Sequence, residues 1–252
     1  MIAVIRSNEM TPTTRKRVGI GLGVVGLGVL ITGLVINARR RKSLGALGLF
    51  NTQPKYRLVD KKYAPAPLVG SYESGGMRME HRRSADMPIE QRVASLQDLV
   101  WKGVQDPQMR KLALQITKHC PERDGLCEAK AVYNYVKANV RYTGDVAPVK
   151  MGSRGPVEGV DLFQTAKRTL EMQGGDCDDH AVLSATLLAH NGITPRFRVT
   201  AETRNGDDSH IYTIAGLSKT NPRKWVALDS TLPGKDQFGV EYPAGRVTDF
   251  PG

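Results

Sequence analysis

Cys177, His210 and Asp229 are the residues whose types and order along this chain could carry nucleophilic catalysis. Cys177 follows a glycine pair and Asp176, a typical helix start, and an Ala/Leu-rich run continues after it to about residue 190. The positive end of a helix dipole stabilises an anion, so a thiolate at Cys177 would be favoured there. A histidine base and an aspartate that orients it would complete a nucleophilic site for acyl transfer.

Three strand-like runs at residues 195–202, 210–217 and 224–229 follow the predicted helix. Alternation places His210 on one face of the second run and Asp229 on one face of the third. We expect these two runs to pair antiparallel, with the helix lying across the face that carries His210 and Asp229. His210 could then reach Cys177 while Asp229 holds the imidazole.

Other titratable residues near Cys177 have simpler explanations. Asp178 and Asp179 are expected to be charges in the first helical turn, which steady the helix but oppose a neighbouring thiolate. His180 and His190 are predicted to be packed or solvated side chains of the same helix rather than catalytic groups. The sequence therefore predicts no metal ligands and no cofactor-binding residues, and the predicted enzyme needs neither.

Cys120 and Cys127 flank a short loop between two predicted helices. A zinc site would need a fourth ligand and a closer cysteine pair, so two alternatives remain. The pair is either a disulfide, if this part of the protein faces an oxidising compartment, or two reduced thiols at a helix junction.

Helical periodicity upstream of the cysteine predicts a helical lobe. Apolar residues recur at helical spacing over residues 88–104, again from Asp106-Pro107 to about residue 120, and over residues 128–140. Their apolar positions are predicted to be core. The sequence thus predicts an α+β fold in which a helical lobe packs on an antiparallel sheet.

The N-terminal region differs from the rest of the 252-residue chain in charge and hydropathy. The net charge is +11, and residues 1–50 hold eight basic residues against one acid. Residues 18–36 carry no charge and lie between basic clusters at 15–17 and 39–42. This pattern favours a membrane-spanning helix of undetermined orientation over a glycine-rich arm buried in an assembly or a signal peptide. Because the charge brackets an apolar run, nucleic-acid binding through this basic region is a secondary hypothesis.

These patterns predict five segments. Residues 1–17 form a basic tail, 18–38 an N-terminal hydrophobic helix in a membrane or assembly, and 39–86 a linker that contains Pro and Gly. Residues 87–240 form the cysteine domain, and 241–252 a C-terminal tail. The predicted localisation is accordingly a membrane or a virion, reached through the single hydrophobic segment.

Three sequence blocks resemble the signatures of the transglutaminase-like superfamily, whose members share a papain-like cysteine-protease core. They are GDCDD at 175–179, SHIY at 209–212 and WVALDST at 225–231, in the order that the superfamily requires. The similarity extends over about residues 90–235 and is closest to the bacterial and phage branch.

This resemblance implies Cys177 as nucleophile, His210 as general base and acid, and Asp229 as the residue that orients His210. The implied enzyme is a cysteine peptidase or amidase that cleaves or exchanges peptide or isopeptide bonds through a thioester on Cys177. The oxyanion would meet the start of the helix and a second donor, for which Gln173 is the candidate. The expected partners are a protein or peptide substrate, such as a peptidoglycan peptide, and membrane or virion proteins bound through residues 18–38.

The main alternative is a structural or interaction component of a phage particle that keeps the domain without catalytic turnover. Substitution of Cys177 separates the two hypotheses, because only an enzyme would lose its function.

Overall fold

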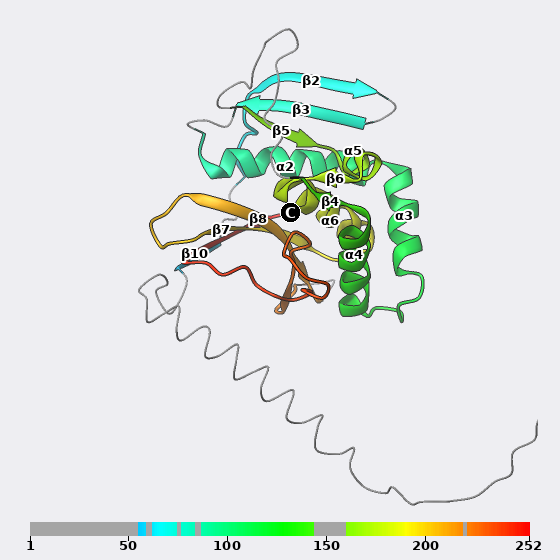
Figure 1. Ribbon diagram of the computed structural model, residues 1–252. Helices are drawn as coiled ribbons and strands as arrows, with labels where there is room; N and C mark the ends of the chain where they lie inside the picture. The colour runs from blue at the N-terminus through cyan, green and yellow to red at the C-terminus, as the bar shows by residue number, and fades with distance from the viewer. Residues whose placement is uncertain (1–54, 59–61, 75–76, 84–86, 144–159, 219–220) are drawn as a thin grey trace, which may run out of the picture. The chain divides into compact units, whose positions relative to one another are not determined.

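Helix α6 (Cys177–His190) lies at the centre of the fold and is buried over residues 179–188. The computed structural model describes residues 55–58, 62–74, 77–83, 87–143, 160–218 and 221–252. Four further helices contact α6: α2 (Ile89–Val104), α3 (Pro107–Thr117), α4 (Gly125–Asn139) and α5 (Ala166–Met172) (Figure 1). Burial on all sides explains why this helix has an almost wholly apolar sequence after its first turn.

A five-stranded sheet covers another side of α6. Its strands run in the order β1 (Lys55–Leu58), β10 (Arg246–Pro251), β7 (Pro195–Ala201), β8 (Asp208–Gly216) and β9 (Trp225–Leu228). β1 pairs parallel with β10, and the other pairs are antiparallel. Phe197, Val199 and Ile211 pack with residues of α6 and α2 in one apolar cluster.

A smaller sheet lies on the other side of α2, as Figure 1 shows. It contains β2 (Leu68–Ser74), β3 (Met77–Arg83) and β5 (Val160–Gln164) in the order β2-β3-β5. Two short strands, β4 (Arg141–Tyr142) and β6 (Gly174–Gly175), pair parallel just before α6. The mixed helix-and-sheet class predicted from the sequence is confirmed.

The predicted helices of the N-terminal lobe are also confirmed, because their start signals act locally. Asp106 caps α3 by accepting a hydrogen bond from the Gln108 main chain, at 2.7 Å. Asp124 caps α4 through the Cys127 main chain at 3.0 Å. The sequence allows either a disulfide or two reduced thiols at Cys120 and Cys127. In the structure the two residues are joined by a disulfide, which closes the turn between these helices.

The structure differs from the predicted segments on both sides of the domain. β1, β2 and β3 lie in the range expected to be a linker, and β10 lies in the range expected to be a tail. Within the described residues, no helix has both the length and the apolar character needed to cross a membrane. That finding contradicts the predicted localisation through a single N-terminal hydrophobic segment, which is withdrawn as wrong. Residues 1–17 and 18–38 lie outside the described part of the chain.

Candidate active site

The short segment between α5 and α6 places Cys177 at the first position of its helix. Gln173 ends α5 in the left-handed conformation, with φ of 51°. Gly175 lies so close to Asp179 that an added Cβ would stand 2.5 Å from the Cβ of Asp179. Asp176 then caps α6 by accepting a hydrogen bond from the Asp179 main chain at 3.3 Å. The predicted cap at Asp176 and helix start at Cys177 are confirmed.

His210 and Asp229 form a hydrogen-bonded pair. The Nε2 atom of His210 lies 2.7 Å from Oδ2 of Asp229, whose carboxylate is fully buried. The other carboxylate oxygen accepts hydrogen bonds from the main chain and hydroxyl of Thr231, at 3.1 and 2.7 Å. Asp229 is therefore held from both oxygens and can fix the plane of the imidazole.

Helix α6 lies against the face of the sheet opposite to the one expected. Thr213 on β8 donates a hydrogen bond to the Ala181 carbonyl of α6 at 2.8 Å, and Ile211 packs near Cys177 in the same apolar cluster. Alternation along β8 turns His210 to the other face, with Tyr212 and Ile214. His210 lies near the start of β8 and Asp229 directly follows β9, so the pair lies at one end of these two antiparallel strands.

An aromatic residue that the sequence reading missed lies against His210. The Tyr242 ring is 4.5 Å from the imidazole, centroid to centroid, and Tyr212 is 5.6 Å away on β8. Tyr242 follows Glu241, which accepts a hydrogen bond from the Tyr212 hydroxyl at 2.6 Å and pairs with Arg198 at 2.8 Å. The Trp225 ring on β9 stacks under the Arg196 guanidinium, 4.3 Å from its centroid.

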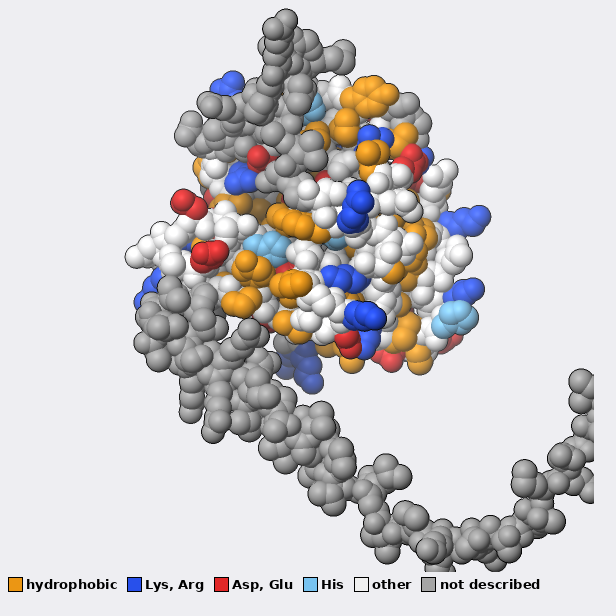
Figure 2. Space-filling view, in the orientation of Figure 1, with side chains coloured by type: hydrophobic (Ala, Val, Ile, Leu, Met, Phe, Trp, Pro, Cys, Tyr) orange, Lys and Arg blue, Asp and Glu red, His pale blue; other side chains and the backbone are white. Residues whose placement is uncertain are grey.

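Figure 2 shows a histidine side chain at the surface of the face that carries β8, between groups of hydrophobic side chains. Cys177 is partly exposed and forms no disulfide. The His210 side chain keeps 10% of its exposure, whereas Asp229 keeps none. Asp229 is thus closed to solvent, whereas Cys177 and His210 both keep partial exposure.

The carboxylates of Asp176, Asp178 and Asp179 lie within 4.8 Å of one another at the start of α6. Gln164 donates to Asp179 from its main chain and its side chain, at 3.1 and 2.5 Å. Burial, then repulsion from Asp176, raises the pKa of Asp179 to about 8. Burial and the same neighbour also raise the pKa of Asp178 well above its ordinary value. Within the described part of the chain, the geometry of these three carboxylates would allow them to share a proton or to bind a cation.

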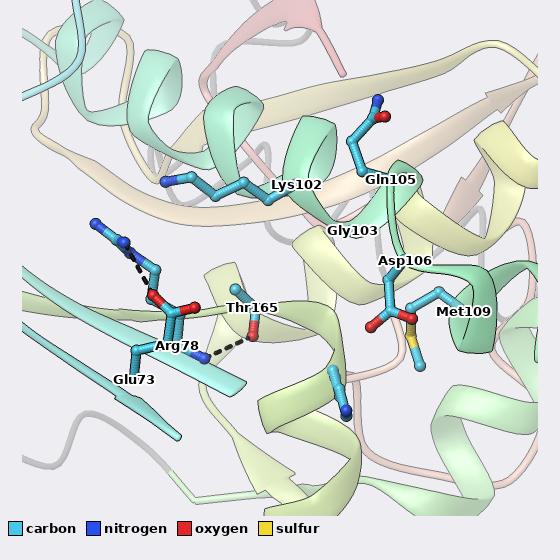
Figure 3. A pocket seen from close by; sticks show the side chains of 9 residues that line it. Glu73, Arg78, Lys102, Gly103, Gln105, Asp106, Met109 and Thr165 are labelled. Carbon is cyan, nitrogen blue, oxygen red and sulfur yellow. Dashed lines mark hydrogen bonds and ion pairs between the residues drawn. The ribbon is translucent and has the colours of Figure 1, made fainter. Parts of the chain in front are cut away.

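A separate cavity of about 330 Å³ lies between α2, α3, α5 and the β2–β3 hairpin. Figure 3 shows the charged ends of Lys102 and Arg78 on the same side of it, and Glu73 and Thr165 bonded to Arg78. None of its lining residues is Cys177, His210 or Asp229. This cavity is therefore distinct from the predicted active site.

Part of the chain matches the sequence model of a known family. Residues 110–230 match the sequence model of the Transglutaminase-like superfamily, which supports the resemblance read from the three blocks. That range contains Cys177, His210 and Asp229. No curated protein matches the chain.

Two solved bacterial structures are similar to parts of the chain. One is a "putative cysteine protease" from Cytophaga hutchinsonii, with 17% identity and a TM-score of 0.37 over 61% of this chain and 49% of that one. The other is a "putative protease" from Parabacteroides distasonis, with 15% identity and a TM-score of 0.33 over 56% of this chain and 31% of that one. The chain thus aligns with less than half of either protein.

Proposed function

We propose that the protein is a thiol acyl-transfer enzyme acting on amide bonds of a protein or peptide substrate, a proposal supported by the match of residues 110–230 to the Transglutaminase-like superfamily. Cys177 is the nucleophile, His210 the general base and acid, and Asp229 the residue that orients His210. The observation that carries the proposal is the 2.7 Å hydrogen bond between His210 Nε2 and the buried Asp229 carboxylate. With Nε2 engaged by Asp229, Nδ1 is the imidazole nitrogen that takes the thiol proton.

The proposed reaction has two halves. His210 takes the proton of the Cys177 thiol, and the sulfur attacks the carbonyl carbon of the scissile amide. The oxyanion that forms is stabilised by the N-terminal end of α6. His210 then gives its proton to the leaving amine as the C–N bond breaks, which leaves a thioester on Cys177. Water or a second amine attacks the thioester, and its proton passes through His210 to the departing Cys177 sulfur.

The surroundings of the pair favour this chemistry. Because the Asp229 carboxylate is shielded from water, it attracts the imidazolium that forms during the reaction more strongly. Tyr242 packs on one side of the His210 ring and limits its rotation. The second oxyanion donor stays a prediction, because Gln173 is exposed at the end of α5 and its side chain has no described contact that aims it at Cys177.

Alkylation of Cys177 by iodoacetamide tests the proposal directly. The chain has three cysteines, and the other two are bonded to each other, so the reaction reports on one thiol. In the intact protein we expect rapid alkylation well below pH ~8.5, the ordinary thiol value. His210→Ala should shift the profile to that of an ordinary thiol and lower the rate of peptide hydrolysis by about 10²–10⁴-fold.

His190→Gln is the matched control, because His190 lies at the far end of the same helix, with Nε2 3.3 Å from the Gly103 carbonyl. It should leave the alkylation profile unchanged. Slow alkylation with an ordinary pH profile in both the intact protein and His210→Ala would contradict the proposal.

A further inference from the structure

His180 joins the helix that carries Cys177 to the turn that carries Asp229. It lies one turn after Cys177 on α6 and is only 3% exposed. Its Nδ1 atom is 2.7 Å from the hydroxyl oxygen of Ser230, which is itself buried and directly follows Asp229. A buried hydrogen bond therefore links the two halves of the proposed site without passing through any of its three residues.

The turn after β9 needs such a link because Asp229 lies beyond the last paired strand residue, Leu228. Lys137 of α4 donates hydrogen bonds to the Ser230 and Leu232 carbonyls. Those bonds fix the turn to α4. The hydrogen bond between Ser230 and His180 connects the same turn to α6.

The electrostatic state of His180 suits this role. Burial lowers the pKa of His180 to about 4, although the Arg141 main chain and nearby carboxylates oppose the shift. The imidazole is therefore neutral at pH 7, and a neutral imidazole has one donor and one acceptor nitrogen. The Ser230 hydroxyl can donate to or accept from Nδ1, so the neutral imidazole keeps this hydrogen bond in either tautomer. The Tyr142 ring packs edge-on against His180, with 6.3 Å between the ring centroids.

We infer that His180 is a positioning residue that holds the Asp229 turn at a fixed place relative to the first turn of α6. The inference rests on the proposed function of Cys177, His210 and Asp229 and extends it by a fourth side chain. His180 touches neither substrate nor reacting atoms. It acts by keeping the carboxylate that orients His210 in register with the helix that presents the nucleophile.

The test measures two properties of the full chain: the pH profile of Cys177 alkylation and the hydrogen exchange of the Thr231 amide. His180→Phe keeps a ring of similar size but loses the nitrogen, and Ser230→Ala removes the other partner. Each of these two variants should slow the alkylation of Cys177 at pH 6 by about 3- to 10-fold, because each loses the net free energy of one hydrogen bond. Each should also speed exchange of the Thr231 amide, which bonds to Asp229 at 3.1 Å.

The double variant and a conservative variant separate positioning from simple packing. His180→Phe with Ser230→Ala should be no slower than either single variant, because both remove the same interaction. His180→Gln can still hydrogen-bond to Ser230 and should restore most of the rate. His190→Gln should change neither property.

The outcomes distinguish this inference from the proposed function. If His210→Ala slows alkylation but His180→Phe and Ser230→Ala leave both properties unchanged, the positioning role is overturned and the proposed function stands. If Cys177 is unreactive in every protein, the proposed function fails, and Thr231 exchange alone decides whether His180 holds the turn. If His180→Phe does not fold, Ser230→Ala supplies the same test with a smaller change, and wild-type rate and exchange in it overturn the inference.

Discussion

Two groups of buried carboxylates, one on β3 and one at the start of α6, meet opposite electrostatic surroundings. Glu80 on β3 is fully buried, and three cations surround it: Arg78, Arg82 and Lys102, at 2.6, 2.6 and 2.7 Å. Burial opposes its ionisation, but the hydrogen bonds from Lys102 and Arg82 outweigh that effect and lower the pKa of Glu80. Here a buried charge is compensated.

At the start of α6, the carboxylate of Asp179 is held by neutral donors and lies close to the carboxylates of Asp176 and Asp178. Asp179 is 3% exposed, and its hydrogen-bond donors are the neutral groups of Gln164. Burial and mutual repulsion raise the pKa values of Asp178 and Asp179, in the direction opposite to that of Glu80. The Glu80 cluster ties a hairpin to a helix, whereas the Asp179 cluster lies next to the proposed nucleophile. Perturbed carboxylates of the second kind are typical of functional sites.

Removal of Glu80 should have the largest effect on stability. Glu80→Ala leaves the buried Arg82 on β3 without its partner at 2.6 Å and takes one carboxylate from both Arg78 and Lys102. We expect a loss of about 3–5 kcal/mol in the free energy of unfolding. Urea unfolding measures it. Glu73→Gln is the control, because Glu73 also pairs with Arg78 but its side chain is 59% exposed, and it should cost less than about 1 kcal/mol. Equal losses in the two variants would remove the distinction between the buried and the exposed pair.

Gly175→Ala tests the packing around Asp179. The new Cβ would meet the Cβ of Asp179 at 2.5 Å, and a helical main chain cannot shift cheaply. We expect a loss of about 1–3 kcal/mol in unfolding free energy, together with slower alkylation of Cys177. Gly70→Ala is the matched control, since an added Cβ there meets nothing within 4 Å. Unchanged stability and alkylation in Gly175→Ala would mean that the approach of Asp179 is not required.

The pH dependence of stability should differ in sign between the two groups. The raised pKa of Asp179 gives stability that is complete below about pH 4 and is lost as the pH rises toward about 8. The lowered pKa of Glu80 gives stability that is present above about pH 4.5 and is lost as the pH falls through the folded value.

Asp179→Asn should therefore flatten the decline in unfolding free energy between pH 5 and 7, by up to about 1.4 kcal/mol per pH unit, whereas Glu80→Gln should not. Urea unfolding at pH 5, 6 and 7 measures the slopes. Parallel curves for the intact protein and Asp179→Asn would show that Asp179 is ionised throughout this range.

The parts of the site that the sequence predicted are those set by short-range signals. The cap at Asp176 and the first helical position of Cys177 depend on residues within four positions of each other. The pairing of His210 with Asp229 follows from two neighbouring antiparallel strands. Alternation also divides β8 into two faces. It could not tell which face meets α6, because both are apolar: Ile211 on one and Ile214 on the other.

The parts that the sequence missed depend on partners far along the chain. β10 lies in the range predicted to be a C-terminal tail, 241–252. In the structure, Arg198 binds both carboxylate oxygens of Asp249, at 2.7 and 2.8 Å, and the charge is buried in the sheet. The contact of Tyr242 with His210 likewise joins residues 32 positions apart, through a loop with no strand or helix to predict it.

The parallel pairing of β1 with β10 sets the limits of a fragment that could be handled alone. Lys55–Leu58 pairs with residues 246–249, so the sheet needs segments from both ends of the described region. A fragment of residues 87–240, the predicted domain, would lack β1, β2, β3 and β10 and would turn β7 into an edge strand. Its unpaired main-chain groups beside Phe197 and Val199 would invite pairing between molecules and aggregation. A fragment meant for crystallisation therefore has to begin before Lys55 and end after Pro251.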